Sequence, residues 1–245
     1  MKYALITGVT KGIGLTIAKT LHADGFHIFG VYKSSESLAE DLSKELSELT
    51  LIQCDLKDRD SFDKIAKVIG DKKLDAVVHN AGVFLENSWN DFSVEKWDRS
   101  IAVNMEAPLL LTKRIEANLN KGIGIVIISS SDSWYAGFED LGYSASKSGL
   151  NNVVKSLAAA LANKKIRVNA VLPGWVDTEM ADKANVDELA HDKSLLGRNA
   201  STQEIADVVS FLLSKKSSFM TGSLIPVDGG YTSVDYVVKK ESENR

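Results

Sequence analysis

Tyr143 and Lys147 stand four residues apart, at the start of a stretch with helical periodicity. On a helix this spacing places both side chains on one face. A free tyrosine has a pKa near ~10 and is a poor acid at neutral pH, but a close ammonium group stabilises its phenolate. The pair therefore predicts proton transfer by Tyr143, with a pKa lowered by Lys147. Taken alone, such a pair is more typical of an exposed helix face, so its surroundings decide.

Hydroxyl groups follow a strongly apolar run elsewhere in the chain. Three serines, Ser129 to Ser131, come directly after Ile125 to Ile128. Four apolar residues in succession indicate a strand that is covered on both faces. A serine hydroxyl just beyond the end of such a strand can donate a hydrogen bond to a substrate carbonyl.

Three glycines with the spacing GxxxGxG follow the first apolar run and precede a helical pattern. Gly8 allows a tight turn, Gly12 lets backbone approach a pyrophosphate at the helix N-terminus, and Gly14 lets the helix pack closely on the sheet. The spacing differs from the GxGxxG of the common dinucleotide motif and from the GxxxxGK[ST] of a P-loop. It predicts a dinucleotide site, and a merely flexible turn is the alternative.

Lysines stand at the positions that determine whether such a site prefers NAD or NADP. A carboxylate at the end of the second strand would bind the ribose 2′-hydroxyl of NAD. Here that position carries Lys33, and Lys11 lies inside the glycine loop. Two ammonium groups predict pairing with a 2′-phosphate, so NADP(H) is favoured over NAD(H). Glu36 is the NAD-binding alternative if the strand runs further, and Asp55 is expected either at the adenine amino group or as a helix N-cap.

Short β-branched runs alternate with amphipathic stretches along the chain. Strands are predicted near residues 3–7, 27–32, 50–53, 74–79, 123–129, 166–172 and 223–227, and helices near 12–24, 36–48, 59–69, 94–119, 143–163 and 202–214. This alternation is typical of a doubly wound α/β fold, a Rossmann-type seven-stranded parallel sheet with helices on both faces. Ligands of such sheets bind beyond the carboxyl ends of the strands, where the serines and glycines are predicted.

The composition is that of one globular domain over residues 1–245, with 44% hydrophobic and 25% charged residues. A chain of this size buries roughly three quarters of its unfolded surface and needs no metal or disulfide to form a core. The lone Cys54 excludes an internal disulfide and a cysteine-clustered zinc site, and fits a cytoplasmic protein. A net charge of −4 gives no indication of nucleic-acid or membrane binding.

Further motifs complete a pattern that resembles the compact branch of the short-chain dehydrogenase/reductase family, and within it most resembles the 3-oxoacyl-[acyl-carrier-protein] reductases. The resemblance covers essentially residues 1 to 230. It rests on Thr7 to Gly14, Asp55, Asn80-Ala81-Gly82, Asn104, Ser130, Tyr143 with Lys147, Pro173 to Thr178, and the closing Val227-Asp228-Gly229-Gly230. Ser130 is chosen among the three serines because the family's serine stands thirteen residues before its tyrosine.

This resemblance implies a catalytic tetrad of Asn104, Ser130, Tyr143 and Lys147. Hydride from NADPH would reach a carbonyl carbon while Tyr143 protonates the oxygen, Ser130 polarises the carbonyl, and Lys147 binds the nicotinamide ribose. In the family the asparagine holds a water through its backbone carbonyl. Pro108, four residues after Asn104, has no N–H that could donate a hydrogen bond to that carbonyl. Alternatively, Asn104 is a buried asparagine whose side chain ties the helix to a neighbouring strand, and the two roles are compatible.

The resemblance also implies which residues contact the dinucleotide. They are Gly8, Thr10, Lys11, Gly12, Ile13, Gly14, Lys33, Ser34, Asp55, Leu56, Asn80, Ala81, Gly82, Tyr143, Lys147, Pro173, Gly174, Val176 and Thr178.

The substrate side is expected around a lid over residues 179–197, with Trp134, Phe138, Trp175 and Met180 lining the substrate pocket. The expected substrate is a 3-oxoacyl thioester, with acyl carrier protein as a partner. A free cyclic ketone, quinone or sugar is the alternative, and an NADP-binding scaffold without turnover is a second one. The resemblance also implies a homotetramer or a homodimer. The tail over residues 231–245 is expected to contribute to a subunit interface.

Overall fold

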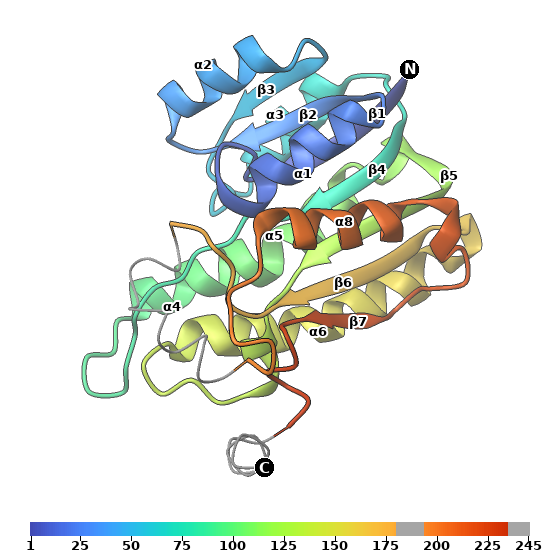
Figure 1. Cartoon of the computed structure of the whole chain (residues 1–245). Coiled ribbons are helices and arrows are strands. Elements are labelled where there is room, and N and C mark those ends of the chain that lie inside the picture. Colours follow the sequence, from blue (N-terminus) through green and yellow to red (C-terminus); the bar gives the residue numbers. More distant parts are fainter. Residues whose placement is uncertain (180–193, 235–245) are drawn as a thin grey trace.

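A computed structural model gives the fold of the chain and describes residues 1–179 and 194–234 (Figure 1). Seven parallel strands form one sheet in the order β3-β2-β1-β4-β5-β6-β7. Their bounds are β1 Lys2–Thr7, β2 Phe26–Tyr32, β3 Leu49–Gln53, β4 Leu74–His79, β5 Leu119–Ile128, β6 Arg167–Pro173 and β7 Leu224–Val227. Because β1 pairs with both β2 and β4, the chain changes direction across the sheet at this point, where ligands of doubly wound sheets bind.

Helices cover both faces of this sheet. They are α1 Gly12–Ala23, α2 Glu36–Glu45, α3 Ser61–Ile69, α4 Val94–Ile101, α5 Ala107–Arg114, α6 Leu141–Leu161 and α8 Thr202–Leu213. Buried side chains of α1, α2 and α8 form the core on one face, and those of α3, α5 and α6 form the core on the other. In Figure 1, α1 and α8 lie in front of the strands and α4, α5 and α6 lie behind them. The predicted doubly wound parallel fold is confirmed.

Strand β5 shows why the central strands are apolar along their whole length. Ile125 and Ile127 belong to the core on one face of the sheet, and Val126 and Ile128 belong to the core on the other. Alternate side chains of a strand point to opposite faces, so a strand covered on both sides by helices has no polar face. Its end is therefore the first position on this strand where a hydroxyl group can face a ligand.

The predicted long helix over residues 94–119 is confirmed as far as Arg114, but it is not one uniform α-helix and it ends about five residues early. The chain forms α4, then a π-helical turn over Ala102–Glu106, then α5, which ends at Arg114. Pro108 cannot donate a backbone hydrogen bond to Asn104, and π turns occur where a helix accommodates an extra residue. Strand β5 begins at Leu119, earlier than the apolar run predicts, because residues 119–122 continue the chain in extended form.

Part of the sequence-based prediction lies outside the described residues. This holds for Met180, for the predicted lid from residue 180 to residue 193, and for the tail from residue 235 onward. Within the part of the chain that is described, no helix combines the length and the apolar character needed to span a membrane.

Candidate active site

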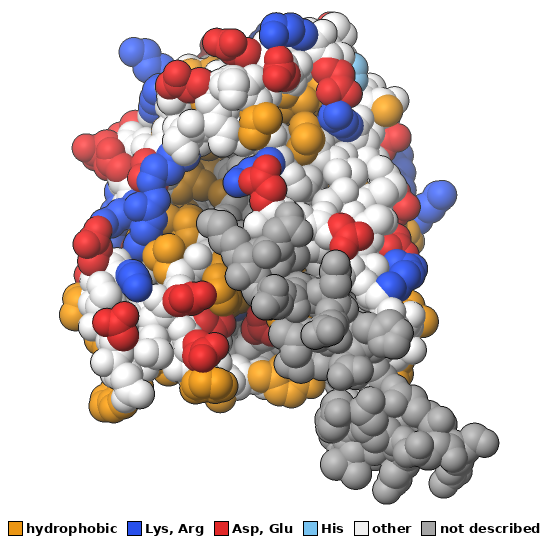
Figure 2. All heavy atoms as spheres, turned by 60° about the vertical axis from the view of Figure 1, so that its left-hand side comes forward, with side chains coloured by type: hydrophobic (Ala, Val, Ile, Leu, Met, Phe, Trp, Pro, Cys, Tyr) orange, Lys and Arg blue, Asp and Glu red, His pale blue; other side chains and the backbone are white. Residues whose placement is uncertain are grey.

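A cavity of about 510 Å³ opens at the carboxyl edge of the sheet. Segments that follow β1, β2, β3, β4, β5 and β6 line it, and all the residues that we expected to contact a dinucleotide are on its wall. Figure 2 shows hydrophobic side chains inside the hollow and charged side chains of both signs around it. The cavity therefore brings together residues that lie far apart in the sequence, from Gly8 to Glu179.

The glycine loop forms a cradle that leaves no room for side chains. Gly8 has φ of +74°, a left-handed conformation that other residues rarely adopt. A Cβ atom on Gly14 would overlap the carbonyl oxygen of Gly8 and the side-chain amide of Asn80. The Nδ2 atom of Asn80 donates to the carbonyls of Thr7 and Gly8, both at 3.0 Å. These bonds lock the loops after β1 and β4 together, and their exposed backbone fits a pyrophosphate group.

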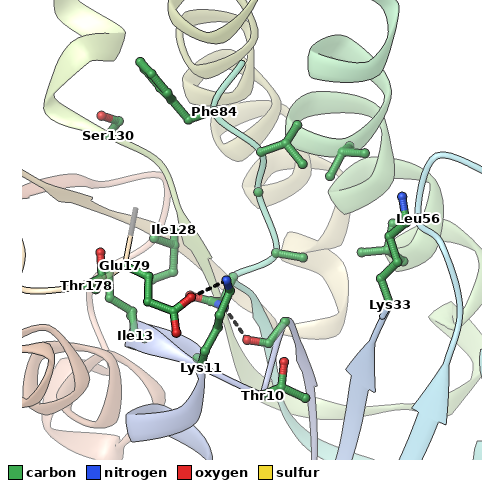
Figure 3. A pocket seen from close by; sticks show the side chains of 18 of the residues that line it. Thr10, Lys11, Ile13, Lys33, Leu56, Phe84, Ile128, Ser130, Thr178 and Glu179 are labelled. Carbon is green, nitrogen blue, oxygen red and sulfur yellow. Dashed lines mark hydrogen bonds and ion pairs between the residues drawn. The ribbon is translucent and has the colours of Figure 1, made fainter. Parts of the chain in front are cut away.

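The two lysines expected at a 2′-phosphate lie at different places on the wall. Figure 3 shows Lys11 reaching toward Glu179, while Lys33 lies across the cavity beside Leu56. The Nζ atom of Lys11 is 2.6 Å from Oε2 of Glu179, and the Nζ atom of Lys33 is 2.6 Å from Oδ2 of Asp55. The sequence did not predict either ion pair.

Asp55 lies between two cations and does not cap a helix. Its Oδ1 accepts a hydrogen bond from the Lys57 backbone N–H at 3.0 Å, and Arg99 of α4 approaches its Oδ2 to 4.0 Å. Burial alone would raise the pKa of Asp55, but the hydrogen bonds from Lys33 and Lys57, with the charges of Lys33 and Arg99, lower it below its usual value. Asp55 is thus an ionised acceptor at this end of the cavity.

Glu36, the alternative NAD-binding acid, is not on the wall of the cavity. Strand β2 ends at Tyr32, and Glu36 is the first residue of α2. Its carboxylate accepts a hydrogen bond from Nε2 of Gln53 at 3.0 Å. The structure therefore places lysine, and not this glutamate, at the end of the second strand.

Tyr143 and Lys147 lie on the buried face of α6. The exposed fractions are 9% for Tyr143 and 3% for Lys147, so the pair is not an ordinary surface pair. The Nζ atom of Lys147 donates to the backbone carbonyl of Ile128 at 2.9 Å and lies 5.7 Å from the centre of the Tyr143 ring. The last residue of β5 thereby fixes the position of the amine beside the phenol.

The pKa of Tyr143 departs from expectation. Burial raises it above its ordinary value, and a hydrogen bond with the Ser130 side chain only partly offsets this. Burial also lowers the pKa of Lys147 to about 8, so its positive charge is itself destabilised. The expected lowering of the Tyr143 pKa by Lys147 is therefore not found in the protein alone, because burial of the phenol is the largest effect on its pKa and raises it.

Ser130 lies at the end of β5 with its hydroxyl close to Tyr143. Its Oγ accepts a hydrogen bond from the backbone N–H of Asp132 at 3.1 Å. Because a hydroxyl group has one hydrogen to donate, this contact leaves the Ser130 O–H available for another acceptor. Ser130 and Tyr143 thus present two hydroxyl groups at one end of the cavity.

Asn104 is placed behind the cavity wall and does not line it. Its Oδ1 accepts from the Val83 backbone N–H at 2.8 Å, and its Nδ2 donates to the Val83 carbonyl and to Oγ of Ser146, both at 3.0 Å. The side chain ties the π-helical turn to the loop after β4 and to α6. Gly82 lies next to both Asn104 and Lys147. A Cβ atom on Gly82 would be 3.4 Å from Oδ1 of Asn104 and 3.6 Å from Nζ of Lys147.

The aromatic residues of the expected substrate pocket divide into two groups. Trp175 lines the cavity, whereas Trp134 and Phe138 do not, and 79% of the Phe138 surface is exposed. The turn after Ser130 explains this correction, because Ser131 and Ser133 take its buried positions and Trp134 is turned outward.

Several residues of the wall were not named as individual site residues in the sequence analysis. Phe84 packs edge-on against Tyr143 with 5.1 Å between ring centroids. Arg99, Asp132 and Glu179 also line the cavity. Asp132 follows Ser130 by two residues and Phe84 follows Gly82 by two residues, so their positions after β5 and β4 are a signal that could have found both. Arg99 comes from α4, which carries no strand-end motif.

These features define a nucleotide-dependent oxidoreductase on a doubly wound sheet. A family model described as enoyl-(acyl carrier protein) reductase matches residues 8–232. The chain belongs to the short-chain dehydrogenase/reductase family. It is 35% identical over 240 residues to "Uncharacterized oxidoreductase YmfI" of Bacillus subtilis, covering 94% of this chain and 98% of that protein.

Other relatives are named for different substrates. The chain is 33% identical to L-xylulose reductase of Bos taurus (93% and 95% covered) and 34% identical to the 3-oxoacyl-[acyl-carrier-protein] reductase FabG of Buchnera aphidicola (94% and 96% covered). Among solved structures it resembles BdcA in complex with NADPH, with a TM-score of 0.87, 28% identity and 93% of each chain covered. It also resembles the angucycline C-6 ketoreductase LanV with bound NADP, with a TM-score of 0.88, 28% identity and coverage of 95% and 96%.

Proposed function

We propose that this protein reduces a ketone to an alcohol with NADPH as the hydride donor. The observation that carries this proposal is one cavity that has two hydroxyl groups and a buried amine at one end and a glycine cradle beside them. Such an arrangement can hold a dinucleotide, orient a carbonyl group and deliver a proton to its oxygen.

Each residue of the proposed tetrad has one role in this reaction. The bound dinucleotide supplies the hydride. Ser130 donates its hydroxyl hydrogen to the carbonyl oxygen and so orients the ketone. Tyr143 transfers its phenolic proton to the oxygen as negative charge develops there, and its raised pKa keeps it protonated until that moment. Lys147 would hold the ribose hydroxyls of the dinucleotide, and the position of its amine is set by the hydrogen bond to the Ile128 carbonyl.

Asn104 is proposed as a positioning residue for proton resupply. Its side chain fixes the π-helical turn through three hydrogen bonds to Val83 and Ser146. Pro108 has no backbone N–H and cannot donate a hydrogen bond to the backbone carbonyl of Asn104. We propose that this carbonyl binds a water molecule that connects Lys147 to solvent.

NADP(H) is proposed over NAD(H) on the charges at the cavity wall. Lys11, Lys33 and Arg99 supply cations there, and no carboxylate occupies the end of β2 itself. The resembling structures that were solved with NADPH and with NADP support the same choice.

The proposed substrate is a 3-oxoacyl thioester, carried by coenzyme A or acyl carrier protein, because several relatives are 3-oxoacyl-[acyl-carrier-protein] reductases. A free cyclic ketone or a sugar is the second candidate, since Phe84 and Trp175 give this end of the cavity flat apolar surfaces. Oxidation of NADPH with acetoacetyl-CoA and with a panel of cyclic ketones separates the two. Turnover of cyclic ketones alone would reject the thioester, and NADPH binding without any turnover would favour a non-catalytic scaffold.

A further inference from the structure

A buried asparagine on α6 holds the chain on both sides of Ser130. Asn151 lies behind the cavity wall and is 7% exposed. Its Oδ1 accepts a hydrogen bond from the Ser129 hydroxyl, and its Nδ2 donates to Oγ of Ser133, both at 2.8 Å. Ser129 directly precedes Ser130, and Ser133 belongs to the 3-10 turn that follows it. One side-chain amide therefore bridges the end of β5 and the turn after it.

Ser133 connects this bridge to Ser130 itself. The Ser133 hydroxyl donates to the backbone carbonyl of Ser130 at 2.5 Å, and the Ser133 backbone N–H donates to the same carbonyl at 3.2 Å. The Ser133 carbonyl accepts from the Ser148 hydroxyl at 2.6 Å, which is a second contact with α6. A hydroxyl group has one hydrogen, so a Ser133 hydroxyl that donates to a carbonyl must accept from Asn151. This requirement agrees with an amide whose nitrogen faces Ser133.

The network separates the serines that hold the turn from the serine that contacts Tyr143. The hydroxyl hydrogen of Ser129 is donated to Asn151, and that of Ser133 is donated to the Ser130 carbonyl. The Ser130 side chain instead forms a hydrogen bond with Tyr143. Of these three serines, Ser130 is therefore the one whose hydroxyl is placed for a substrate carbonyl.

Asn151 belongs to the same face of α6 as Tyr143 and Lys147. The three residues follow one another at intervals of four positions, and all three side chains are buried. Lys147 donates to the carbonyl of Ile128, the last residue of β5, while Asn151 bonds the residues on either side of Ser130. One face of one helix thus carries the phenol and also fixes the position of the serine beside it.

We propose that Asn151 is a positioning residue for the reaction, which holds the Ser130 hydroxyl where a ketone oxygen also lies within reach of Tyr143. This inference rests on the proposed function, because it takes Ser130 and Tyr143 as the two groups that contact the carbonyl. Asn151 does not line the cavity, so its effect on the rate passes through Ser130. A misplacement of about 1 Å can lower a rate about 100-fold, so a small displacement of Ser130 is visible in kcat.

The test replaces Asn151 by leucine, which has a similar shape and cannot bond Ser129 or Ser133. Asn151→Leu is expected to lower kcat for the best ketone about tenfold and to leave the dissociation constant for NADPH within about twofold of wild type. Asn152→Leu is the matched control, because Asn152 is the next residue of α6 and is exposed. It should change neither value. Ser133→Ala breaks the same link with a smaller change and should lower kcat about threefold or more, which keeps the test decisive if Asn151→Leu does not fold.

A double-mutant cycle with Ser130→Ala distinguishes positioning from a general loss of structure. Because Asn151 acts through Ser130, Asn151→Leu should lower the residual kcat of Ser130→Ala by less than about twofold, against about tenfold in the wild-type background. An equal loss in both backgrounds would overturn the inference. A wild-type kcat in both Asn151→Leu and Ser133→Ala would overturn it as well.

Hydrogen exchange tests the anchoring without any turnover. The backbone N–H groups of Ser133 and Tyr135 donate to carbonyls within the turn. Their exchange is expected to be about tenfold faster in Asn151→Leu than in wild type or in Asn152→Leu. Unchanged exchange in Asn151→Leu would overturn the inference. A protein that shows this difference in exchange but reduces no ketone would contradict the proposed reaction and still support the anchoring of the turn by Asn151.

Discussion

The buried amine of Lys147 donates a hydrogen bond to the backbone carbonyl of Ile128, with 2.9 Å between nitrogen and oxygen. Ile128 is the last residue of β5 and Ser130 follows two positions later, so this bond ties α6 to the strand end that carries the serine. Tyr143, one helical turn before Lys147, is held beside Ser130 by the same contact. The proposed site therefore depends on a helix-to-strand contact as much as on the spacing within α6.

The burial of Lys147 predicts a rise in stability at alkaline pH. Burial lowers its pKa to about 8 in the folded protein from the ordinary lysine value of 10.5, so the unfolded chain binds more protons between these two pH values. The free energy of unfolding should then increase by about 2 kcal/mol from pH 8 to pH 10. Chemical denaturation across this range should show the rise in wild type and a flatter profile in Lys147→Met. Parallel profiles would contradict the assignment.

Replacement of Gly14 by alanine should destabilise the fold. The new Cβ would overlap the Gly8 carbonyl oxygen and the Asn80 amide, and overpacking of this kind costs about 1–3 kcal/mol. Thermal unfolding of Gly14→Ala should therefore occur several degrees below that of wild type. Gly82→Ala serves as the control for stability, because its nearest contact of 3.4 Å is ordinary. Equal melting temperatures for the two variants would argue against the close packing at Gly14.

Lys33 should contribute to the preference for NADPH. Its amine lies on the cavity wall and is half-exposed, so we expect Lys33→Ala to raise the KM for NADPH about tenfold and to change the KM for NADH by no more than about twofold. Lys57→Ala removes a nearby exposed lysine that is not on the wall and should change neither value. An unchanged ratio of the two KM values in Lys33→Ala would remove Lys33 from the 2′-phosphate site.

Asp132 should influence the pH dependence of ketone reduction. Burial is the main cause of the raised pKa of Tyr143, and the negative charge of Asp132 raises it further. A general acid must be protonated to act. Removal of the charge in Asp132→Asn should lower that pKa and move the alkaline limb of the kcat profile to lower pH. Steady-state rates measured up to about pH 11, above the ordinary tyrosine pKa near ~10, report the shift. A limb that stays in place or moves upward would contradict the electrostatic coupling.

The sequence predicted the parts of the site that follow from strand ends. The apolar run from Ile125 to Ile128 indicated a strand buried on both faces, which places Ser130 at the carboxyl edge of the sheet. The glycine spacing likewise indicated the cradle after β1. Both inferences need only the alternation of side chains along a strand and the direction of parallel strands.

The sequence could not predict contacts that depend on side-chain direction across loops. The ion pair of Lys33 with Asp55 joins segments after two different strands, and Arg99 reaches it from the face of α4. Trp134 was expected in the pocket because it is aromatic and near Ser130, but the buried Ser131 and Ser133 determine which way the turn faces. The pKa of Tyr143 depends on burial, which the spacing of Tyr143 and Lys147 does not report.

The substitution Tyr143→Phe tests the central claim most directly. It removes the phenolic hydroxyl and keeps the ring that packs against Phe84. A general acid contributes about 10²–10⁴-fold to a rate, so kcat for the best ketone should fall at least about 100-fold. The dissociation constant for NADPH, measured by fluorescence, should stay within about threefold of wild type, since the cradle and the lysines are untouched. Undiminished ketone reduction by Tyr143→Phe would contradict the account.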